Sequence, residues 1–240
     1  MYTKSLDIMT RIHGGDNHPD VAKSYGSLGN VYNRQGQYER ALEYYQKGLE
    51  INIKVSGQDH PDVATSFNNI GALYDSQGKY EEALDYYQKD LDIIVRLVGD
   101  DHPDVADSFN NIGLVYEKKG DLENALVQHQ KALEIRTRVF GSDHPDVAKS
   151  RLGIGAVYAG KGDLENALVQ YQKGLEIQTR VYGSDHPDVA ASKENIGLVF
   201  QKMTKKSEAR QMFTEAAGIR RKVFGADHPL TKKSERLAAQ

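Results

Sequence analysis

Histidine is the residue type in this sequence that most readily suggests chemistry, because an imidazole can bind a metal ion or exchange a proton near pH 7. Six of the eight histidines precede a proline, and they recur at one constant spacing. They are His18, His60, His102, His144, His186 and His228, so that successive numbers differ by 42. Such a spacing places them on translated copies of one unit, where side chains point in parallel rather than converge on one ion. We therefore expect structural histidines, no metal site and no cofactor.

Other catalytic patterns are incomplete. Residues 155–162 are similar to a phosphate-binding loop, but Gly162 stands where that loop needs a hydroxyl group, and no strand is expected before it. The chain has no cysteine, which removes disulfides, thiolate zinc sites, iron–sulfur clusters and cysteine nucleophiles. His129 replaces a tyrosine found at the same place in other units, and we expect a half-buried packing residue there. We do not expect an enzyme.

The overall composition is that of a globular protein, since 39% of the residues are hydrophobic and 27% are charged. The net charge of −3 gives no overall positive field, so we expect neither nucleic acid nor a membrane surface as a partner. No stretch approaches the ~18 consecutive apolar residues of a membrane-spanning helix. The first residues also lack an apolar signal-peptide segment. We expect an intracellular, cytoplasmic protein.

The spacing of the histidines extends over the whole sequence. Residues 120–148 and 162–190, for example, differ at only four positions. A half repeat at 2–18 is followed by full repeats at 19–60, 61–102, 103–144, 145–186 and 187–228, and by a short segment at 229–240. A fixed period of this length is the signature of a repeat array. No change of composition interrupts it, so we predict a single domain of residues 1–240.

Each repeat has the pattern of two helices. In the second repeat, Pro61 suits a first helical turn, and Asp59 or His60 can accept hydrogen bonds from the free N–H groups there. Apolar residues follow at steps of three and four, and Gly78 ends the first helix. A second helix with the same periodicity ends near Gly99.

One position in the middle of every first helix is glycine, although glycine there costs about 1 kcal/mol relative to alanine. These residues are Gly29, Gly71, Gly113, Gly155 and Gly197. One position of every second helix is alanine in the same way. We expect these small residues to mark places where neighbouring helices approach closely.

The face of the first helices that points away from the core carries apolar residues beside asparagines. Asn30 is replaced by alanine or leucine in the later repeats, and Gly26 by Leu152 in the fourth. An asparagine amide can both donate to and accept from a peptide backbone. The surface comprises Asn30, Arg34, Asn68, Asn69, Ala72, Asn110, Asn111, Leu114, Leu152, Asn195 and Leu198. It is either a binding surface with an apolar floor or an ordinary helix surface, since exposed alanine and leucine are common.

Charge is distributed unevenly along the chain. Residues 1–120 hold 12 basic and 19 acidic side chains, whereas residues 121–240 hold 19 basic and 15 acidic ones. Arg151 and Lys193 stand where the earlier repeats have an aromatic residue. Either their stems pack while their charges reach water, or they form a basic end of the surface that selects acidic groups of a ligand.

These motifs resemble the tetratricopeptide repeat. The order aromatic-x-x-[Leu/Ile]-Gly-x-x-Tyr, then Gly, then Ala-Leu-x-x-Tyr is similar to that repeat. The 42-residue period, with its Gly-x-Asp-His-Pro-Asp-Val-Ala joint, resembles the kinesin light chain type. The resemblance implies an all-α fold, a right-handed α-solenoid of antiparallel helix pairs whose first helices line a concave groove. It also implies that the asparagines contact an extended peptide.

We therefore predict a protein-interaction scaffold that binds an extended peptide or a partner segment in this groove. Two alternatives stay open: a non-catalytic sensor segment of a larger multidomain protein, and an idealised or engineered array without a ligand. Tyr2, Leu6 and Ile8 match the second helix of a repeat. We accordingly expect a fragment of a longer array, whose N-terminal half repeat can stack end to end on another copy.

Overall fold

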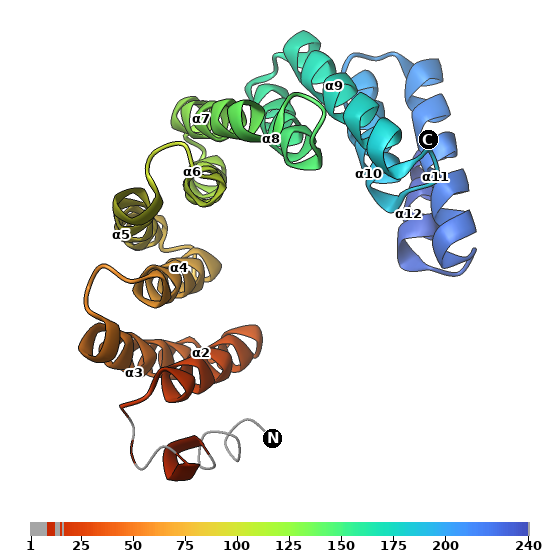
Figure 1. Cartoon of the computed structure of the whole chain (residues 1–240). Helices are drawn as coiled ribbons and strands as arrows, with labels where there is room; N and C mark the ends of the chain where they lie inside the picture. The colour runs from red at the N-terminus through yellow and green to blue at the C-terminus, as the bar shows by residue number, and fades with distance from the viewer. Residues whose placement is uncertain (1–8, 13–14, 16, 240) are drawn as a thin grey trace. The chain divides into compact units, whose positions relative to one another are not determined.

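The chain folds into pairs of helices that follow the predicted repeats (Figure 1). The computed structural model describes residues 9–12, 15 and 17–239, and no strand occurs among them. The helices are α2 (Pro19–Arg34), α3 (Tyr38–Ser56), α4 (Pro61–Ser76), α5 (Tyr80–Val98), α6 (Pro103–Lys119), α7 (Leu122–Phe140), α8 (Pro145–Lys161), α9 (Leu164–Tyr182), α10 (Pro187–Lys202), α11 (Lys206–Phe224) and α12 (Pro229–Ala238). The all-α prediction is confirmed. Tyr2, Leu6 and Ile8, on which the expected end-to-end stacking depends, lie outside the described residues.

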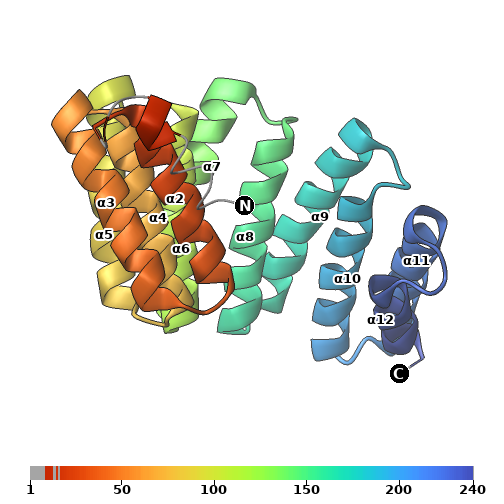
Figure 2. The ribbon, with the colours of Figure 1, turned by 90° about the horizontal axis from the view of Figure 1, so that it is seen from below.

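The chain divides into two compact units, residues 1–121 and 122–240, with the boundary between α6 and α7. In the first unit, α2, α4 and α6 follow one another on one side, and α3 and α5 lie on the other (Figure 1). In the second unit, α8, α9 and α10 lie side by side, and α12 packs against α11 (Figure 2). The expected single domain stays a prediction.

The His-Pro joints begin the first helices. His60 is the N-cap of α4, and its Nδ1 accepts a hydrogen bond from the backbone N–H of Asp62 at 3.1 Å. The same bond recurs at the start of α2, α6, α8, α10 and α12. Asp59, the other candidate for the cap, instead pairs with Arg96 of α5 at 2.7 Å. Each of these Nδ1 atoms accepts from an N–H group that the first turn leaves free, so the histidine acts as the N-cap.

The turn within each pair requires a left-handed backbone residue. Gly78 supplies it between α4 and α5, with φ +72°. Thr204 takes the equivalent place between α10 and α11 at φ +62°, a conformation that a β-branched residue rarely adopts. The last full repeat therefore keeps the left-handed turn of the other repeats, although its sequence has no glycine there.

Consecutive repeats share their apolar cores. Ala41 and Tyr45 of α3 pack against Ile70 and Leu73 of α4, and all four are at most 3% exposed. Within each unit, the second helix of a pair thus packs against the first helix of the next pair. A first helix between two such neighbours uses two of its stripes for packing.

The mid-helix glycines lie beneath aromatic rings of the second helices, as the sequence analysis predicts. A Cβ atom added to Gly71 would meet the Tyr87 ring at 3.1 Å, and one added to Gly155 would meet Tyr171 at 2.8 Å. At Gly197 it would meet Phe213 at 2.6 Å. The ring occupies the space that a methyl group would need, so only glycine allows this approach.

His129 differs from the expectation of a half-buried residue, because its side chain is 0% exposed. It takes the place on α7 that tyrosine has at 45, 87 and 171 and phenylalanine at 213, and it lies close to Gly153 of α8. The small residue opposite it explains the complete burial, because no side chain holds α8 away from the imidazole.

The described residues lack two features. Within 9–12, 15 and 17–239, no helix is both long and apolar enough to cross a membrane. In the same residues, no three histidine or acidic side chains come together to hold a metal ion.

We predict opposite effects for two glycine-to-alanine substitutions in the last full repeat. Gly197→Ala should lower the free energy of unfolding by about 2 kcal/mol, because the overlap with the buried Phe213 ring outweighs the gain in helix propensity. Gly218→Ala on α11 should raise it by up to about 1 kcal/mol, because its Cβ would meet nothing within 4 Å. Denaturant unfolding of both variants measures the difference. Equal stabilisation by both would contradict the close approach.

Candidate functional site

The clearest candidate surface lies on the open face of α4 and α6. Asn69 on α4 and Asn111 on α6 hold equivalent positions in successive repeats, and both are half-buried. Neither amide has a hydrogen-bond partner within the described part of the chain. Asparagines with free donors and acceptors at a regular spacing can bind a peptide backbone.

Each of these asparagines has an apolar neighbour one helical turn further on. Ala72 follows Asn69, and Leu114 follows Asn111, at the three-residue spacing that places side chains side by side on a helix. Leu114 is 43% exposed. We call these four residues, Asn69, Ala72, Asn111 and Leu114, the α4–α6 face.

An ion pair joins the two helices beside this face. The Nζ of Lys118 on α6 lies 2.6 Å from Oδ2 of Asp75 on α4. Asp75 is only 16% exposed, whereas the Lys118 side chain is 50% exposed. The pair links the last turns of α4 and α6 beside the face.

The α2 residues of the predicted surface are differently arranged. Asn30 is exposed, but its Oδ1 accepts a hydrogen bond from the Tyr45 hydroxyl group at 2.7 Å. Its carbonyl oxygen is therefore engaged, and its amide N–H groups remain as donors. Arg34 is exposed in the last turn of the same helix.

Three predicted residues occupy the stripe next to the open face, and two of them are directed between helices. Asn68 donates a hydrogen bond to the Asp90 carboxylate of α5. Leu152 packs against α9, where its Cδ2 would lie 2.9 Å from a Cβ atom on Gly174. Asn110 is the equivalent residue on α6 and is half-buried. The 100° step of a helix puts this stripe at the border of the core. The direction of each side chain there therefore depends on which residue of the second helix lies opposite it.

In the second unit, helix α10 carries both an asparagine and the apolar residue three positions after it. Asn195 on α10 is half-buried, and Leu198 one turn later is 38% exposed. The equivalent residues on α8 are Gly153 and Ala156, which offer no amide.

Arg151 and Lys193 contact the second helix of their own pair. Arg151 Nη1 donates to Oε1 of Gln170 on α9 at 3.3 Å. The ammonium of Lys193 pairs with Glu215 on α11 at 2.5 Å. These contacts engage both positive charges inside the pairs, and the basic end of the surface stays a prediction.

Buried polar contacts join the pairs, and residue types and spacing did not reveal them. In α4, α6, α8, α10 and α12, a serine bonds to a polar residue of the preceding second helix. These contacts are Asn52–Ser66 at 3.0 Å, Asp90–Ser108 at 2.7 Å, Arg136–Ser150 at 2.7 Å, Gln178–Ser192 at 2.6 Å and Arg220–Ser234 at 2.7 Å. The recurrence of serine at one position of every repeat was the available signal. Its partners change from repeat to repeat, so no pattern revealed the pairing.

Three of these junctions contain a charged side chain, namely Asp90, Arg136 and Arg220. Burial raises the pKa of the Asp90 carboxyl group, and hydrogen bonds from Ser108 and Asn68 offset that effect only in part. At Glu194 burial acts in the same sense, but hydrogen bonds from Arg220 and Ser234 outweigh it and lower the pKa. Among the described residues no lysine or arginine pairs with Asp90, whereas Glu194 is paired with Arg220.

Comparison with known proteins identifies the repeat. The family model of the tetratricopeptide repeat matches residues 1–54, 20–94, 62–136, 104–177 and 150–222. No curated protein matches the chain in sequence.

Solved structures show the same fold at low sequence identity. BtubC (BKLC) from P. vanneervenii aligns over 95% of this chain and 91% of its own, with 21% identity and a TM-score of 0.80. A Podosopora anserina protein described as a kinesin light chain with nearly identical TPR-like repeats aligns over 86% and 98%, with 22% identity and a TM-score of 0.72. YrrB, described as a TPR protein with an unusual peptide-binding site, aligns over 98% and 97%, with 23% identity and a TM-score of 0.52.

We predict that Asp90→Asn stabilises the chain at neutral pH. A raised pKa in the folded state means that ionised Asp90 lowers stability above that pKa, and that this loss disappears as the pH falls towards the unfolded value of 3.8. An asparagine can keep the bonds to Ser108 and Asn68 without the buried charge. The melting temperature of the variant should therefore exceed that of the wild type at pH 7.5, and the gap should narrow towards pH 4.

The control for this comparison is Asp85→Asn, which removes an exposed carboxylate of the same helix. It should change the melting temperature little at either pH. A destabilised Asp90→Asn variant at pH 7.5 would contradict the raised pKa of the Asp90 carboxyl group.

Proposed function

The chain belongs to the tetratricopeptide-repeat family, and we propose that it is a non-catalytic scaffold that binds an extended peptide on the open face of its first helices. The observation that carries this proposal is the α4–α6 face. It presents two equivalent, unpartnered amides, each beside an apolar side chain.

The spacing of the face suits an extended chain. Side chains of α4 and α6 meet in the ion pair between Asp75 and Lys118, and an extended peptide advances about 3.3 Å per residue. A short extended segment can therefore reach both Asn69 and Asn111. Each amide can bond one backbone N–H and one C=O group, which fixes the direction and position of the peptide without reading its sequence.

The apolar neighbours of the asparagines make the face selective for particular peptide side chains. Ala72 leaves space above α4, whereas Leu114 projects a larger apolar side chain from α6. An apolar peptide side chain between the two asparagines would be buried against Ala72 and Leu114. The apolar surface removed from water there would contribute about 25 cal/mol per Å² to the free energy of binding. Val55 and Val139 on the second helices are equally exposed, and neither has an unpartnered amide three residues before it in its helix.

A relative adds support to the choice of ligand. YrrB, which shares the fold, is described as having a peptide-binding site. The same helix pairs in this chain place no carboxylate, imidazole and nucleophile together on the α4–α6 face, so binding rather than turnover is the function that its chemistry supports.

The proposal is tested with a peptide library screened against the whole chain and against an Asn69→Ala, Asn111→Ala double variant. Alanine is a better helix former than asparagine, so the variant should fold. Peptides selected by the wild type should bind the variant about 10-fold or more weakly, because two amide hydrogen-bonding groups are lost at about 1 kcal/mol each. Fluorescence anisotropy measures the affinity.

The matched control is Gln46→Ala with Gln88→Ala, which removes two exposed amides at equivalent positions of the second helices α3 and α5. It should leave the affinity unchanged. If both double variants bound the selected peptides as the wild type does, the peptide would not lie on the first helices.

A further inference from the structure

One carboxylate oxygen beside the α4–α6 face has no hydrogen-bond partner in the described part of the chain. It is the buried Oδ1 of Asp75. The other oxygen, Oδ2, accepts a hydrogen bond from Nζ of Lys118 at 2.6 Å. Asp75 follows Ala72 by three residues on α4, so its side chain lies one turn beyond the face. A buried acceptor without a donor destabilises the fold, and a donor supplied by a ligand would remove that penalty.

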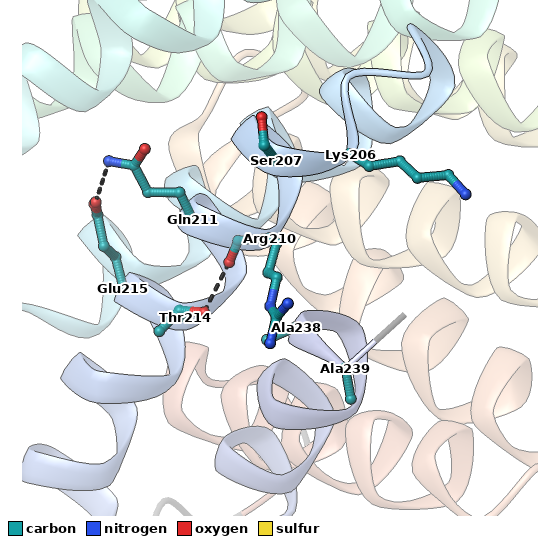
Figure 3. Close-up of a pocket in the computed structure, with 8 residues that line it drawn as sticks. All are labelled: Lys206, Ser207, Arg210, Gln211, Thr214, Glu215, Ala238 and Ala239. Atoms are coloured by element: carbon teal, nitrogen blue, oxygen red, sulfur yellow. Dashed lines mark hydrogen bonds between the residues drawn. The ribbon is translucent and has the colours of Figure 1, made fainter.

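A carboxylate of the second unit shows the ordinary arrangement. Oε2 of Glu215 accepts a hydrogen bond from Lys193 at 2.5 Å, and its Oε1 accepts one from Gln211 at 2.9 Å (Figure 3). Asp75 is more buried, with 16% of its side chain exposed against 37% for Glu215, and yet only one of its oxygens has a donor. The single ammonium group at Asp75 therefore leaves half of the carboxylate unsatisfied.

A second polar group near Asp75 also lacks a partner. The hydroxyl group of Tyr87 on α5 makes no hydrogen bond with another described residue, although Tyr87 is only 6% exposed. In the preceding repeat the equivalent Tyr45 donates to Oδ1 of Asn30 at 2.7 Å, but Ala72 stands at that position on α4. Burial, and after it the charge of Asp75, raises the pKa of the Tyr87 hydroxyl group, so the two groups lie within electrostatic range of each other.

The charges in this part of the chain favour a cation as the missing donor. Residues 1–120 hold 12 basic and 19 acidic side chains, which attracts positive groups of a ligand. The Lys118 side chain is 50% exposed, so its ammonium group stays hydrated when another cation replaces it at Asp75.

The geometry of the two unsatisfied groups selects arginine over lysine. A guanidinium group donates two parallel hydrogen bonds to a carboxylate, whereas an ammonium group acts as a point charge. Of the five N–H groups of an arginine side chain, two can bond to the oxygens of Asp75, and another can bond to the oxygen of Tyr87.

We propose that the α4–α6 face includes a subsite for an arginine side chain of the bound peptide, formed by Asp75 and Tyr87. This inference rests on the proposed function, because it adds a specific side chain to the same ligand. The guanidinium replaces Lys118 at Asp75, and the aliphatic stem of the arginine passes along α4 beside Ala72. Alternate side chains of an extended peptide point to one side, so the arginine stands two residues from the apolar residue that contacts Leu114.

The test uses the whole chain and the peptide library of the proposed function. Selected peptides should share an arginine two residues from an apolar residue. The most enriched peptide is synthesised with arginine and with citrulline, a neutral residue of nearly the same shape, and fluorescence anisotropy measures both affinities. The wild type should bind the arginine peptide about 10-fold more tightly, because hydrogen bonds to a charged group are stronger when the donor is also charged.

Three variants assign this preference to the subsite. Asp75→Asn should abolish the preference and leave the affinity for the citrulline peptide unchanged. Tyr87→Phe should reduce the preference in part, because it removes the hydroxyl group and keeps the ring on Gly71. Lys118→Met should strengthen the binding of the arginine peptide, because the competing ammonium group is gone.

The matched control is Asp85→Asn, which removes an exposed carboxylate of α5 and should leave the preference intact. Selected peptides without arginine, or a preference that survives Asp75→Asn, would overturn the subsite and leave the proposed function standing. Asn69→Ala with Asn111→Ala should weaken both peptides by the same factor. If it weakened neither, the proposed function would be contradicted, whereas loss of the preference in Asp75→Asn would still assign the guanidinium to Asp75. Selection of no peptide by the wild type would contradict both.

Discussion

The close approach of an aromatic ring to a mid-helix glycine is the constraint on which the rest of the structure depends. Tyr87 on Gly71, Tyr171 on Gly155 and Phe213 on Gly197 bring the two helices of a pair closer than any larger residue would allow. The same second helix then packs on the next first helix, so one ring sets the spacing in two directions. Repetition of this contact from pair to pair makes the architecture additive.

This packing determines which parts of the sequence are free for function. A first helix contacts its own partner with one stripe and the preceding second helix with another, and the remaining stripe faces solvent. Only that stripe can carry unpartnered amides such as those of Asn69 and Asn111 without a cost in stability.

Periodicity made the helices, their glycine contacts and the open stripe predictable, because each depends on residue spacing alone. The residues at the border of that stripe were not predictable in the same way. Asn68 bonds to Asp90 because this residue of the second helix accepts a hydrogen bond. Leu152 packs against Gly174 because the glycine leaves space for its side chain. The sequence offers two candidates for the N-cap of α4, Asp59 and His60. The structure shows that His60 is the N-cap, whereas Asp59 pairs with Arg96. Contacts between different repeats vary in partner and therefore need coordinates.

The central claim, that ligand binding occurs on the open stripe of the first helices, is tested most directly by photo-cross-linking. A peptide selected by the whole chain would carry a photoreactive residue in place of its apolar side chain, and mass spectrometry would locate the linked residues. We expect links to α4 and α6 near Ala72 and Leu114, because these apolar side chains lie beside the unpartnered asparagines. Links confined to the second helices α3 and α5 would contradict the account.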